Sequence, residues 1–333
     1  MTRVLELDPE HPQKDALELA ASIIVGGGLV AFPTETVYGL GADAMNEDAV
    51  RKIYVAKGRP ADNPCIVHVD SRAMLDRVAC RVSPIADRLI QEFWPGPLTL
   101  VLERSPEVAP SVSAGLSTVA ARMPASRIAL ELIGSAKTPV AAPSANASGR
   151  PSPTSAAHVR DDLDGRIDLI LDGGVTNIGI ESTVLDLTAD PPTILRPGWI
   201  THERLTEAIG PLGSAVSDKN LRSSPGIRHP HYNPRARVLL VEQGSPESLE
   251  RVCREQLKNG SIWFIGHSQL EIDDPSFHSI RLGWDAGEYA HSIYAALREA
   301  DKNEPRVIVV EGISDAGKGE AVMDRLRRAA SKL

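Results

Sequence analysis

The sequence predicts an α/β protein built from two domains. Short apolar runs of strand length alternate with stretches of helical periodicity, first along residues 1–209 and again along 236–333. Residues 210–235 lack this periodicity and are rich in Gly, Ser, Pro, Asn and His, which is typical of a linker. A chain of 333 residues is also too long for one typical core. We therefore expect a larger domain at 1–209, a linker at 210–235 and a smaller domain at 236–333.

The first domain is predicted to contain a mixed, open, twisted sheet flanked by helices. Apolar residues at helical spacing predict a helix from Ala16 to the glycines Gly26–Gly28, and a second helix that carries Lys57 at its C-terminal end. Residues 33–41 are expected to form a loop. Further helices are expected at 84–93, 125–133, 154–163 and 201–209, and strands at 29–32, 65–69, 98–102, 118–122, 139–142, 169–171, 182–187 and 193–196.

The second domain is predicted to be a small three-layer α/β unit, because strands and helices alternate strictly along it. The expected strands are 238–241, 261–265 and 306–310, and the expected helices are 246–258, 286–301 and 318–330.

The composition excludes several classes of protein. The formal net charge is −8 and aromatic residues make up only 4%, which argues against tight non-specific nucleic-acid binding and against a base-stacking platform. No apolar run approaches the roughly 18 residues that span a bilayer, and the N-terminus lacks a signal-peptide pattern. The three cysteines are far apart and form no Cys-x-x-Cys pair. We expect a cytoplasmic protein without membrane contact.

Two polar loops that directly follow apolar strands predict a ligand pocket. The strand at 139–142 leads into a loop of hydroxyls, an amide and prolines that includes Ser144, Asn146, Arg150 and Ser152. The strand at 29–32 leads into the second loop, 33–41. In open α/β sheets, ligands bind where such loops leave the strands.

Four cations near these loops are candidate ligand-binding groups. Lys57 and Arg59 stand at a helix end that Pro60 stiffens, which favours contact with phosphate over a solvated pair that complements the helix dipole. Arg122 ends an apolar strand and needs an anionic partner, which could be a ligand carboxylate or an internal Asp. Arg196 poses the same choice.

Other side chains leave their roles open. His68 lies between two valines, as packed core histidines do, and Glu35 and Glu181 could each act as a base or a magnesium ligand, so the metal-binding residues stay unknown. No Ser-His-Asp arrangement stands out. The cations, hydroxyls and amides favour catalysis by positioning and charge stabilisation, as in nucleotidyl or phosphoryl transfer.

The second domain contains a partial P-loop match at 312–319, where Gly319 replaces the hydroxyl residue that holds magnesium, so a kinase-like site on Lys318 is disfavoured. His229 and His231 have the spacing of a metal pair but are more typical of a linker surface.

Seven ordered blocks of sequence resemble the YrdC-type threonylcarbamoyl-adenylate synthases. The linker and the second domain, which ends in Met323–Leu326, resemble the longer, two-domain form of that family. The blocks are Phe32–Gly41, Lys57–Pro60 with Asn63–Pro64, Trp94–Thr99, Arg122–Pro124, Ala142–Asn146, Glu181–Thr183 and Leu195–Gly198.

The resemblance implies a YrdC-like sheet, a Rossmann-like second domain and a reaction. L-threonine, bicarbonate and ATP would give threonylcarbamoyl-adenylate and pyrophosphate, the first step of tRNA threonylcarbamoyladenosine modification. Mg²⁺ would accompany ATP, and the tRNA threonylcarbamoyl transferase machinery would be the downstream partner. The alternative is a tRNA-binding module of the same fold without nucleotidyl transfer, with at most weak tRNA contact expected here.

The resemblance also implies roles for individual residues. Lys57 and Arg59 would be catalytic cations near the phosphates. The linker would act as an active-site lid, although Asn233 replaces the alanine usual in the family's linker. Threonine would be held by Thr36, His68, Arg122, Ala142 and Ser182. ATP would be held by Arg59, Asn63, Thr118, Ser144, Ser152, Arg196 and Tyr232.

Overall fold

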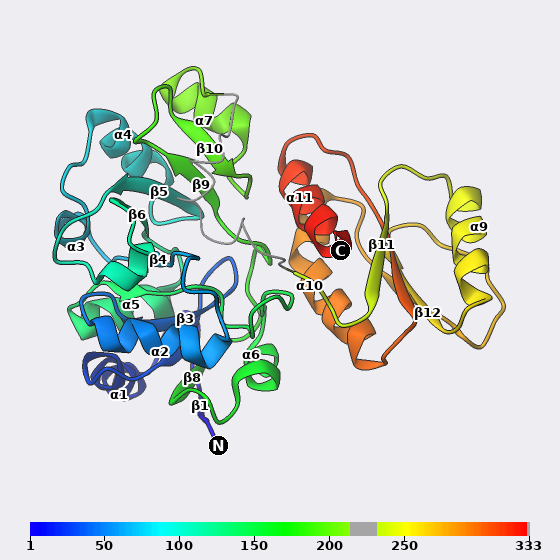
Figure 1. Ribbon diagram of the computed structural model, residues 1–333, viewed down its shortest axis with the longest axis horizontal. Coiled ribbons are helices and arrows are strands. Elements are labelled where there is room, and N and C mark those ends of the chain that lie inside the picture. The colour runs from blue at the N-terminus through cyan, green and yellow to red at the C-terminus, as the bar shows by residue number, and fades with distance from the viewer. Residues whose placement is uncertain (214–231, 332–333) are drawn as a thin grey trace. The chain divides into compact units, whose positions relative to one another are not determined.

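A computed structural model describes residues 1–213 and 232–331, which fall into two compact units. Among the described residues, the first unit contains 1–148, 152–177 and 181–213. The second contains 232–331 together with the short segments 149–151 and 178–180. Residues 214–231 of the predicted linker and lid, which include His229 and His231, lie outside the described residues. Figure 1 shows both units.

The first unit is built on one ten-stranded mixed sheet (Figure 1). A mixed sheet was predicted, but its strands β1 and β3 were not. Its strands lie in the order β1-β8-β2-β3-β7-β4-β6-β5-β9-β10. The strands are β1 (Arg3–Glu6), β2 (Val30–Pro33), β3 (Tyr38–Asp43), β4 (Ile66–His68), β5 (Leu98–Glu103), β6 (Thr118–Arg122), β7 (Val140–Ala141), β8 (Leu169–Asp172), β9 (Thr183–Asp186) and β10 (Thr193–Arg196).

The helices of the first unit include every one that the sequence predicted. Among the described residues, the helix α3 and the short 3₁₀ helix η1 were not predicted. The helices are α1 (Lys14–Val25), α2 (Glu47–Lys57), α3 (Arg72–Val78), α4 (Pro84–Phe93), η1 (Pro110–Ser113), α5 (Arg127–Ala136), α6 (Ala156–Leu163) and α7 (His202–Ile209).

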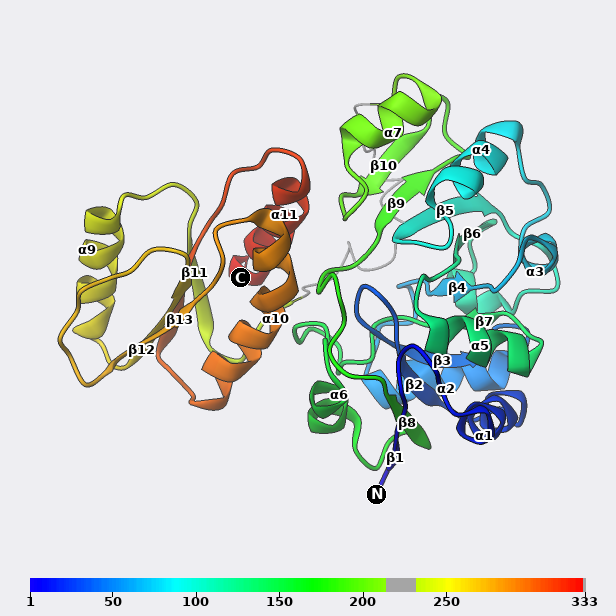
Figure 2. The same ribbon diagram turned by 180° about the vertical axis from the view of Figure 1, so that it is seen from behind.

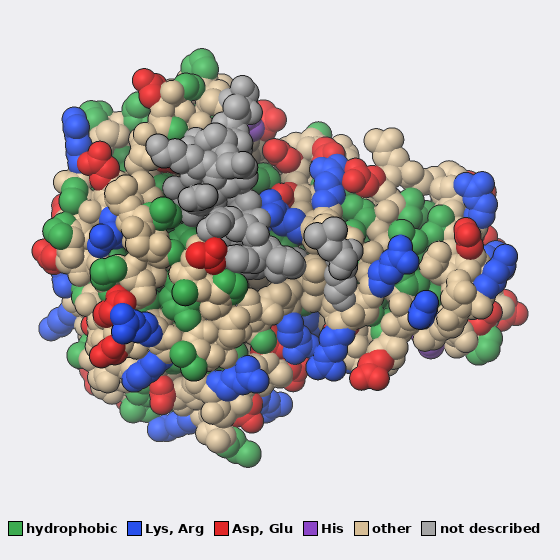
Figure 3. Space-filling model, in the orientation of Figure 1, with side chains coloured by type: hydrophobic (Ala, Val, Ile, Leu, Met, Phe, Trp, Pro, Cys, Tyr) green, Lys and Arg blue, Asp and Glu red, His purple; other side chains and the backbone are tan. Residues whose placement is uncertain are grey.

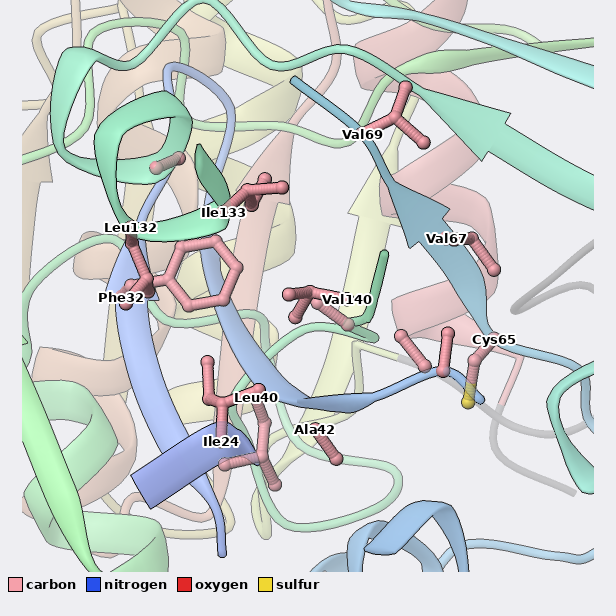
Figure 4. Close-up of a cluster of buried hydrophobic side chains, with 14 of the residues drawn as sticks. Ile24, Phe32, Leu40, Ala42, Cys65, Val67, Val69, Leu132, Ile133 and Val140 are labelled. Atoms are coloured by element: carbon pink, nitrogen blue, oxygen red, sulfur yellow. The ribbon is translucent and has the colours of Figure 1, made fainter. Parts of the chain in front are cut away.

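The hydrophobic core of the first unit is formed by side chains of the sheet and of the helices that lie far apart in the sequence. In Figure 4, Phe32 of β2, Leu40 of β3 and Val140 of β7 lie in one apolar cluster with Leu132 and Ile133 of α5. All five are fully buried. Burying an aliphatic or aromatic side chain of this size stabilises a fold by about 1.5–3 kcal/mol, so this cluster fixes the strands whose ends carry polar residues.

The loop predicted at 33–41 is only partly a loop, because β3 begins at Tyr38. Of the two glycines in this strand, Gly41 is required by the neighbouring ring. A Cβ on Gly41 would lie 2.7 Å from the ring of Phe32 and 2.9 Å from Val140 Cγ1. Glycine therefore lets the sheet carry a large aromatic side chain at this point.

The second unit has a four-stranded parallel sheet with helices on both faces (Figure 2). The strand order is β11-β14-β12-β13, and α9 lies on one face while α10 and α11 lie on the other. The strand β13 was not predicted. The elements are β11 (Arg237–Val241), α9 (Pro246–Leu257), β12 (Ile262–Gly266), β13 (Phe277–Arg281), α10 (Ala286–Lys302), β14 (Val307–Glu311) and α11 (Lys318–Ala330).

Candidate active site

Several of the predicted site residues meet at one edge of the first sheet. β4 and β6 are parallel, and their last residues, His68 and Arg122, lie opposite each other in register. β5 runs antiparallel to β6 and begins at this edge with Thr99 as its second residue. β9 is parallel to β5, so Ser182 immediately before it lies there too, and antiparallel β10 ends there with Arg196.

Arg122 is the centre of one polar cluster at this edge, and only 3% of it is exposed. Its Nε donates to the carbonyl of Gly96 at 3.1 Å, and its Nη1 donates to Thr36 Oγ1 at 2.9 Å. Its Nη2 lies 2.6 Å from Glu35 Oε1. An internal carboxylate therefore faces Arg122, and it is a glutamate rather than the aspartate considered from the sequence.

His68 is buried beside Arg122 and is neutral. Burial, together with the positive charge of Arg122, lowers the pKa of His68 to about 3. Its ring stands edge-on to Phe32, with the ring centroids 6.2 Å apart. Nδ1 is buried and has no hydrogen-bond partner among the described residues. A neutral imidazole with an unused nitrogen can donate to or accept from a ligand hydroxyl.

A second cluster connects β5, β9 and β10. Ser182 Oγ lies 2.8 Å from Thr99 Oγ1. Arg196, also buried, donates from Nε and Nη2 to the Ser182 carbonyl at 3.2 and 3.0 Å. These bonds hold the Ser182 hydroxyl and the Arg196 guanidinium at the same sheet edge as Arg122.

The C-terminal end of α2 determines the positions of Lys57 and Arg59. The helix stops at Gly58, whose φ of 61° is left-handed, and the chain turns there. Buried Lys57 then donates to the carbonyls of Ser144 and Asn146. Arg59 donates to the carbonyl and side-chain oxygen of Asn63 at 3.0 and 2.7 Å. Both cations are thus fixed largely by neutral oxygens.

The predicted hydroxyl loop 143–153 is bound to β3 and carries two more polar contacts. Ser144 Oγ donates to Asn146 Oδ1 at 2.6 Å, so the loop side chains order one another. Ser152 Oγ donates to Glu181 Oε1 at 2.5 Å in a buried position. Glu181 therefore contacts a hydroxyl that the sequence assigned to ATP binding.

Two predicted residues of the first unit, Thr118 and Ala142, are not members of these clusters, and Tyr232 is not part of the first unit. Thr118 begins β6 and so stands at the opposite end from Arg122, opposite Glu103 of β5. Ala142 is buried, and its N–H donates to the Ile66 carbonyl. Tyr232 belongs to the second unit, where its ring stacks on Tyr294 with centroids 5.4 Å apart. Their ligand roles stay predictions.

Sequence reasoning missed three contributors to the clusters: the Gly96 carbonyl, the Thr99 hydroxyl and the contact of Glu35 with Arg122. Gly96 and Thr99 stand inside the block Trp94–Thr99 that carries the resemblance, and that block was the signal that could have pointed to them. The contact between Glu35 and Arg122 joins residues far apart in sequence and has no local signal.

Among residues 1–213 and 232–331, no group of three or more His, Cys, Asp or Glu side chains has the arrangement of a metal site. The helices within those ranges include none that combines the length and apolar character needed to cross a membrane.

Comparison with known proteins assigns the class of this site. Residues 22–198 match the Sua5–YciO–YrdC family, which is described as "Telomere recombination". Residues 200–331 match the family described as the C-terminal domain of threonylcarbamoyl-AMP synthase. The chain therefore belongs to the Sua5–YciO–YrdC family and carries that second domain as well, which confirms the family predicted from the motifs.

Relatives and solved structures resemble the chain over nearly its whole length. The threonylcarbamoyl-AMP synthase of Pyrococcus abyssi is 46% identical over 96% of this chain and 96% of its own. That of Bacillus subtilis is 45% identical over 98% and 95%. The crystal structure of Pyrococcus abyssi Sua5 complexed with L-threonine superposes with a TM-score of 0.93 at 43% identity, covering 99% of this chain and 98% of that one.

Proposed function

We propose that the chain synthesises threonylcarbamoyl-AMP from L-threonine, bicarbonate and ATP, releasing pyrophosphate and water. The observation that carries this proposal is the combination of the full-length likeness to threonylcarbamoyl-AMP synthases with buried cations at the sheet edge. The product would be passed to the machinery that modifies tRNA.

In this proposal the Arg122 cluster holds threonine. The guanidinium takes the carboxylate, because a planar fork of N–H groups matches two carboxylate oxygens. Thr36, Ser182 and neutral His68 surround the side-chain hydroxyl with groups that can donate or accept, and Ala142 is the remaining proposed threonine contact. These contacts would favour threonine over an isosteric amino acid that lacks the hydroxyl.

ATP would occupy the Lys57–Arg59 side of the site. Lys57 is oriented there by the carbonyls of Ser144 and Asn146 and Arg59 by Asn63, and both positive charges can bind phosphate. Asn63, Thr118, Ser144, Ser152, Arg196 and Tyr232 are the other proposed nucleotide contacts. The carbamate of threonine attacks the α-phosphate and pyrophosphate leaves, while the cations stabilise the charge that develops on both.

Mg²⁺ would enter with ATP. The described residues provide no cage of three ligands for a metal, but Mg²⁺ in nucleotide sites commonly uses phosphate oxygens and one or two carboxylates. Glu181, held against Ser152, has the donor chemistry for one such contact. When bound, the ion would neutralise charge on the phosphates.

The test is pyrophosphate release measured with threonine, with valine and without amino acid, each with and without bicarbonate. Threonine should outperform valine by about 1–3 kcal/mol in transition-state stabilisation, because valine leaves hydroxyl partners unpaired. Equal release with valine, or release that needs neither amino acid nor bicarbonate, would contradict the proposal.

A tRNA-binding module without nucleotidyl transfer has weaker support. On the face shown in Figure 3, basic and acidic side chains are interspersed and do not gather in a basic field. Filter binding with tRNA at physiological salt, run beside the pyrophosphate assay, separates the two functions: tight tRNA binding without pyrophosphate release would favour the module.

A further inference from the structure

Glu35 is a buried carboxylate whose hydrogen-bonding capacity is unused. It lies between β2 and β3 and is 9% exposed. Its Oε1 is 2.6 Å from Arg122 Nη2, but the two groups are not aligned as a hydrogen bond. Among the described residues, neither oxygen of Glu35 has a hydrogen-bond partner, and neither has Arg122 Nη2. Buried polar atoms are nearly always hydrogen-bonded, so this pair is prepared for a further group.

Arg122 is held in place independently of Glu35. Its Nε and Nη1 are fixed by the Gly96 carbonyl and the Thr36 hydroxyl. Only the side of the guanidinium that carries Nη2 faces Glu35. A ligand carboxylate that approaches Nη2 must therefore enter beside the carboxylate of Glu35.

The charges at this point select the kind of ligand that can enter. A ligand with a carboxylate alone would put two anions against one guanidinium in a buried place, and an unpaired buried charge is costly. An amino acid zwitterion carries its ammonium group one carbon atom away from its carboxylate. It leaves the net charge of the pair unchanged and supplies each member with an oppositely charged, hydrogen-bonding partner.

We propose that Glu35 binds the protonated α-amino group of the amino acid substrate while Arg122 binds its carboxylate. This assignment rests on the proposed function, since it takes threonine as the occupant. It makes Glu35 the residue that distinguishes an α-amino acid from a hydroxy acid or other carboxylate of the same shape.

The competing explanation is that Glu35 only neutralises Arg122. The probe that separates the two is 3-hydroxybutanoate, which has the carbon skeleton and hydroxyl of threonine without the α-amino group. Calorimetry with a non-cleavable ATP analogue present gives the affinity of wild type and Glu35→Gln for threonine and for this analogue. Glu107→Gln, an exposed glutamate in the same unit, is the matched control.

Wild type should bind threonine at least about tenfold more tightly than 3-hydroxybutanoate, since a hydrogen bond to a charged group is at stake. Glu35→Gln should weaken threonine binding and leave or improve binding of the analogue, so that this preference falls at least about tenfold. Glu107→Gln should keep the wild-type ratio. If Glu35→Gln changes both affinities in the same proportion, Glu35 is only a counter-ion and the proposal is wrong.

Far-UV circular dichroism and thermal melting establish that the variants fold. If Glu35→Gln does not fold, Glu35→Asp takes its place, because a shortened carboxylate should still weaken threonine more than the analogue; an unchanged ratio overturns the proposal. The function is tested separately. Wild type that binds threonine but releases no pyrophosphate contradicts the synthase activity alone, whereas active wild type with an unchanged ratio in the variant contradicts only the role of Glu35.

Discussion

Two buried glutamates, one in each unit, have opposite hydrogen-bonding surroundings. Glu311 ends β14 in the second unit and is 3% exposed. Its Oε2 accepts from the backbone N–H groups of His267 and Ser268, both at 2.8 Å, and its Oε1 accepts from Ser268 Oγ at 2.6 Å. Glu35 follows β2 in the first unit and has no hydrogen bond among the described residues.

The difference distinguishes a structural carboxylate from one that is prepared for a ligand. Glu311 connects the ends of β12 and β14, and removing it would leave buried donors unpaired. Among the described residues Glu35 makes no hydrogen bond, and its Oε1 lies 2.6 Å from a cation that other groups already hold. Substitution of Glu35 or Arg122 should therefore change substrate use, and substitution of Glu311 should change stability.

The largest effect is expected from the cations of the first unit. Arg122→Ala should lower kcat/KM for threonine about 10²–10³-fold with little change in KM for ATP, and Arg59→Ala should do the reverse, because one meets a carboxylate and the other phosphates. Steady-state kinetics with each substrate varied in turn measure both. If the two variants lose the same substrate, the assignment of two separate subsites is incorrect.

A loss of stability without a loss of substrate affinity is expected at Glu311. Glu311→Ala should lower the free energy of unfolding by about 2–4 kcal/mol, because three hydrogen-bond donors lose their acceptor. KM for threonine and ATP should stay unchanged while the variant is folded. Urea denaturation and kinetics at 25 °C measure the two quantities, with Glu311→Gln as the conservative variant. A folded Glu311→Gln with a raised KM for threonine would show that this carboxylate serves the site.

Much of the fold could be predicted from local pattern, and the exceptions have physical reasons. Helices such as α4 and strands such as β6 have the predicted bounds because apolar spacing and caps agree there. β3 was predicted as part of the polar loop 33–41, yet it is a strand in which the ring of Phe32 requires glycine at position 41. β13 is an edge strand with little burial, so it lacks the apolar run that marks a strand.

Only those residues of the site that belong to a sequence motif could be predicted. The polar loops and the cations Lys57, Arg59 and Arg122 could be predicted because charged and amide groups beside buried strands require polar or charged partners. Which partner each cation meets depends on the register of distant strands. The contact of Arg122 with Glu35 arises only once β4, β6 and the loop before β3 are assembled.

A pH-dependent effect on stability is expected from His68. Its pKa is about 3 in the folded protein and 6.5 in the reference state, so unfolding takes up a proton between these values. The stability that this adds is fully present above pH 6.5 and is lost as the pH falls toward 3. Between pH 7.5 and 4.5, wild type should lose about 2–3 kcal/mol more than His68→Asn. If the free energy of unfolding fell by the same amount in wild type and in His68→Asn over this pH range, His68 would not be a buried, neutral histidine.

The smallest effect is expected at Lys318, in the stretch of the second unit that resembles a P-loop. Lys318 begins α11 after the strand β14, as a phosphate-binding lysine would, and it is exposed. The position after it cannot supply the hydroxyl that such a loop needs for magnesium. A Cβ on Gly319 would lie 1.9 Å from the Ser314 carbonyl oxygen. The packing of the loop itself therefore excludes Ser or Thr there.

Lys318→Ala should accordingly leave turnover and KM for ATP unchanged, whereas Arg59→Ala raises KM for ATP. Gly319→Ser tests whether the missing hydroxyl alone prevents nucleotide binding. The variant should have a lower melting temperature, because the serine side chain forces the loop apart. It should bind Mg-ATP in the second unit no better than wild type. Calorimetry with Mg-ATP and thermal melting measure these outcomes. If Lys318→Ala abolished ATP binding while Arg59→Ala did not, the nucleotide would bind at the P-loop-like stretch of the second unit, and the assignment of ATP to the Lys57–Arg59 side of the first unit would be wrong.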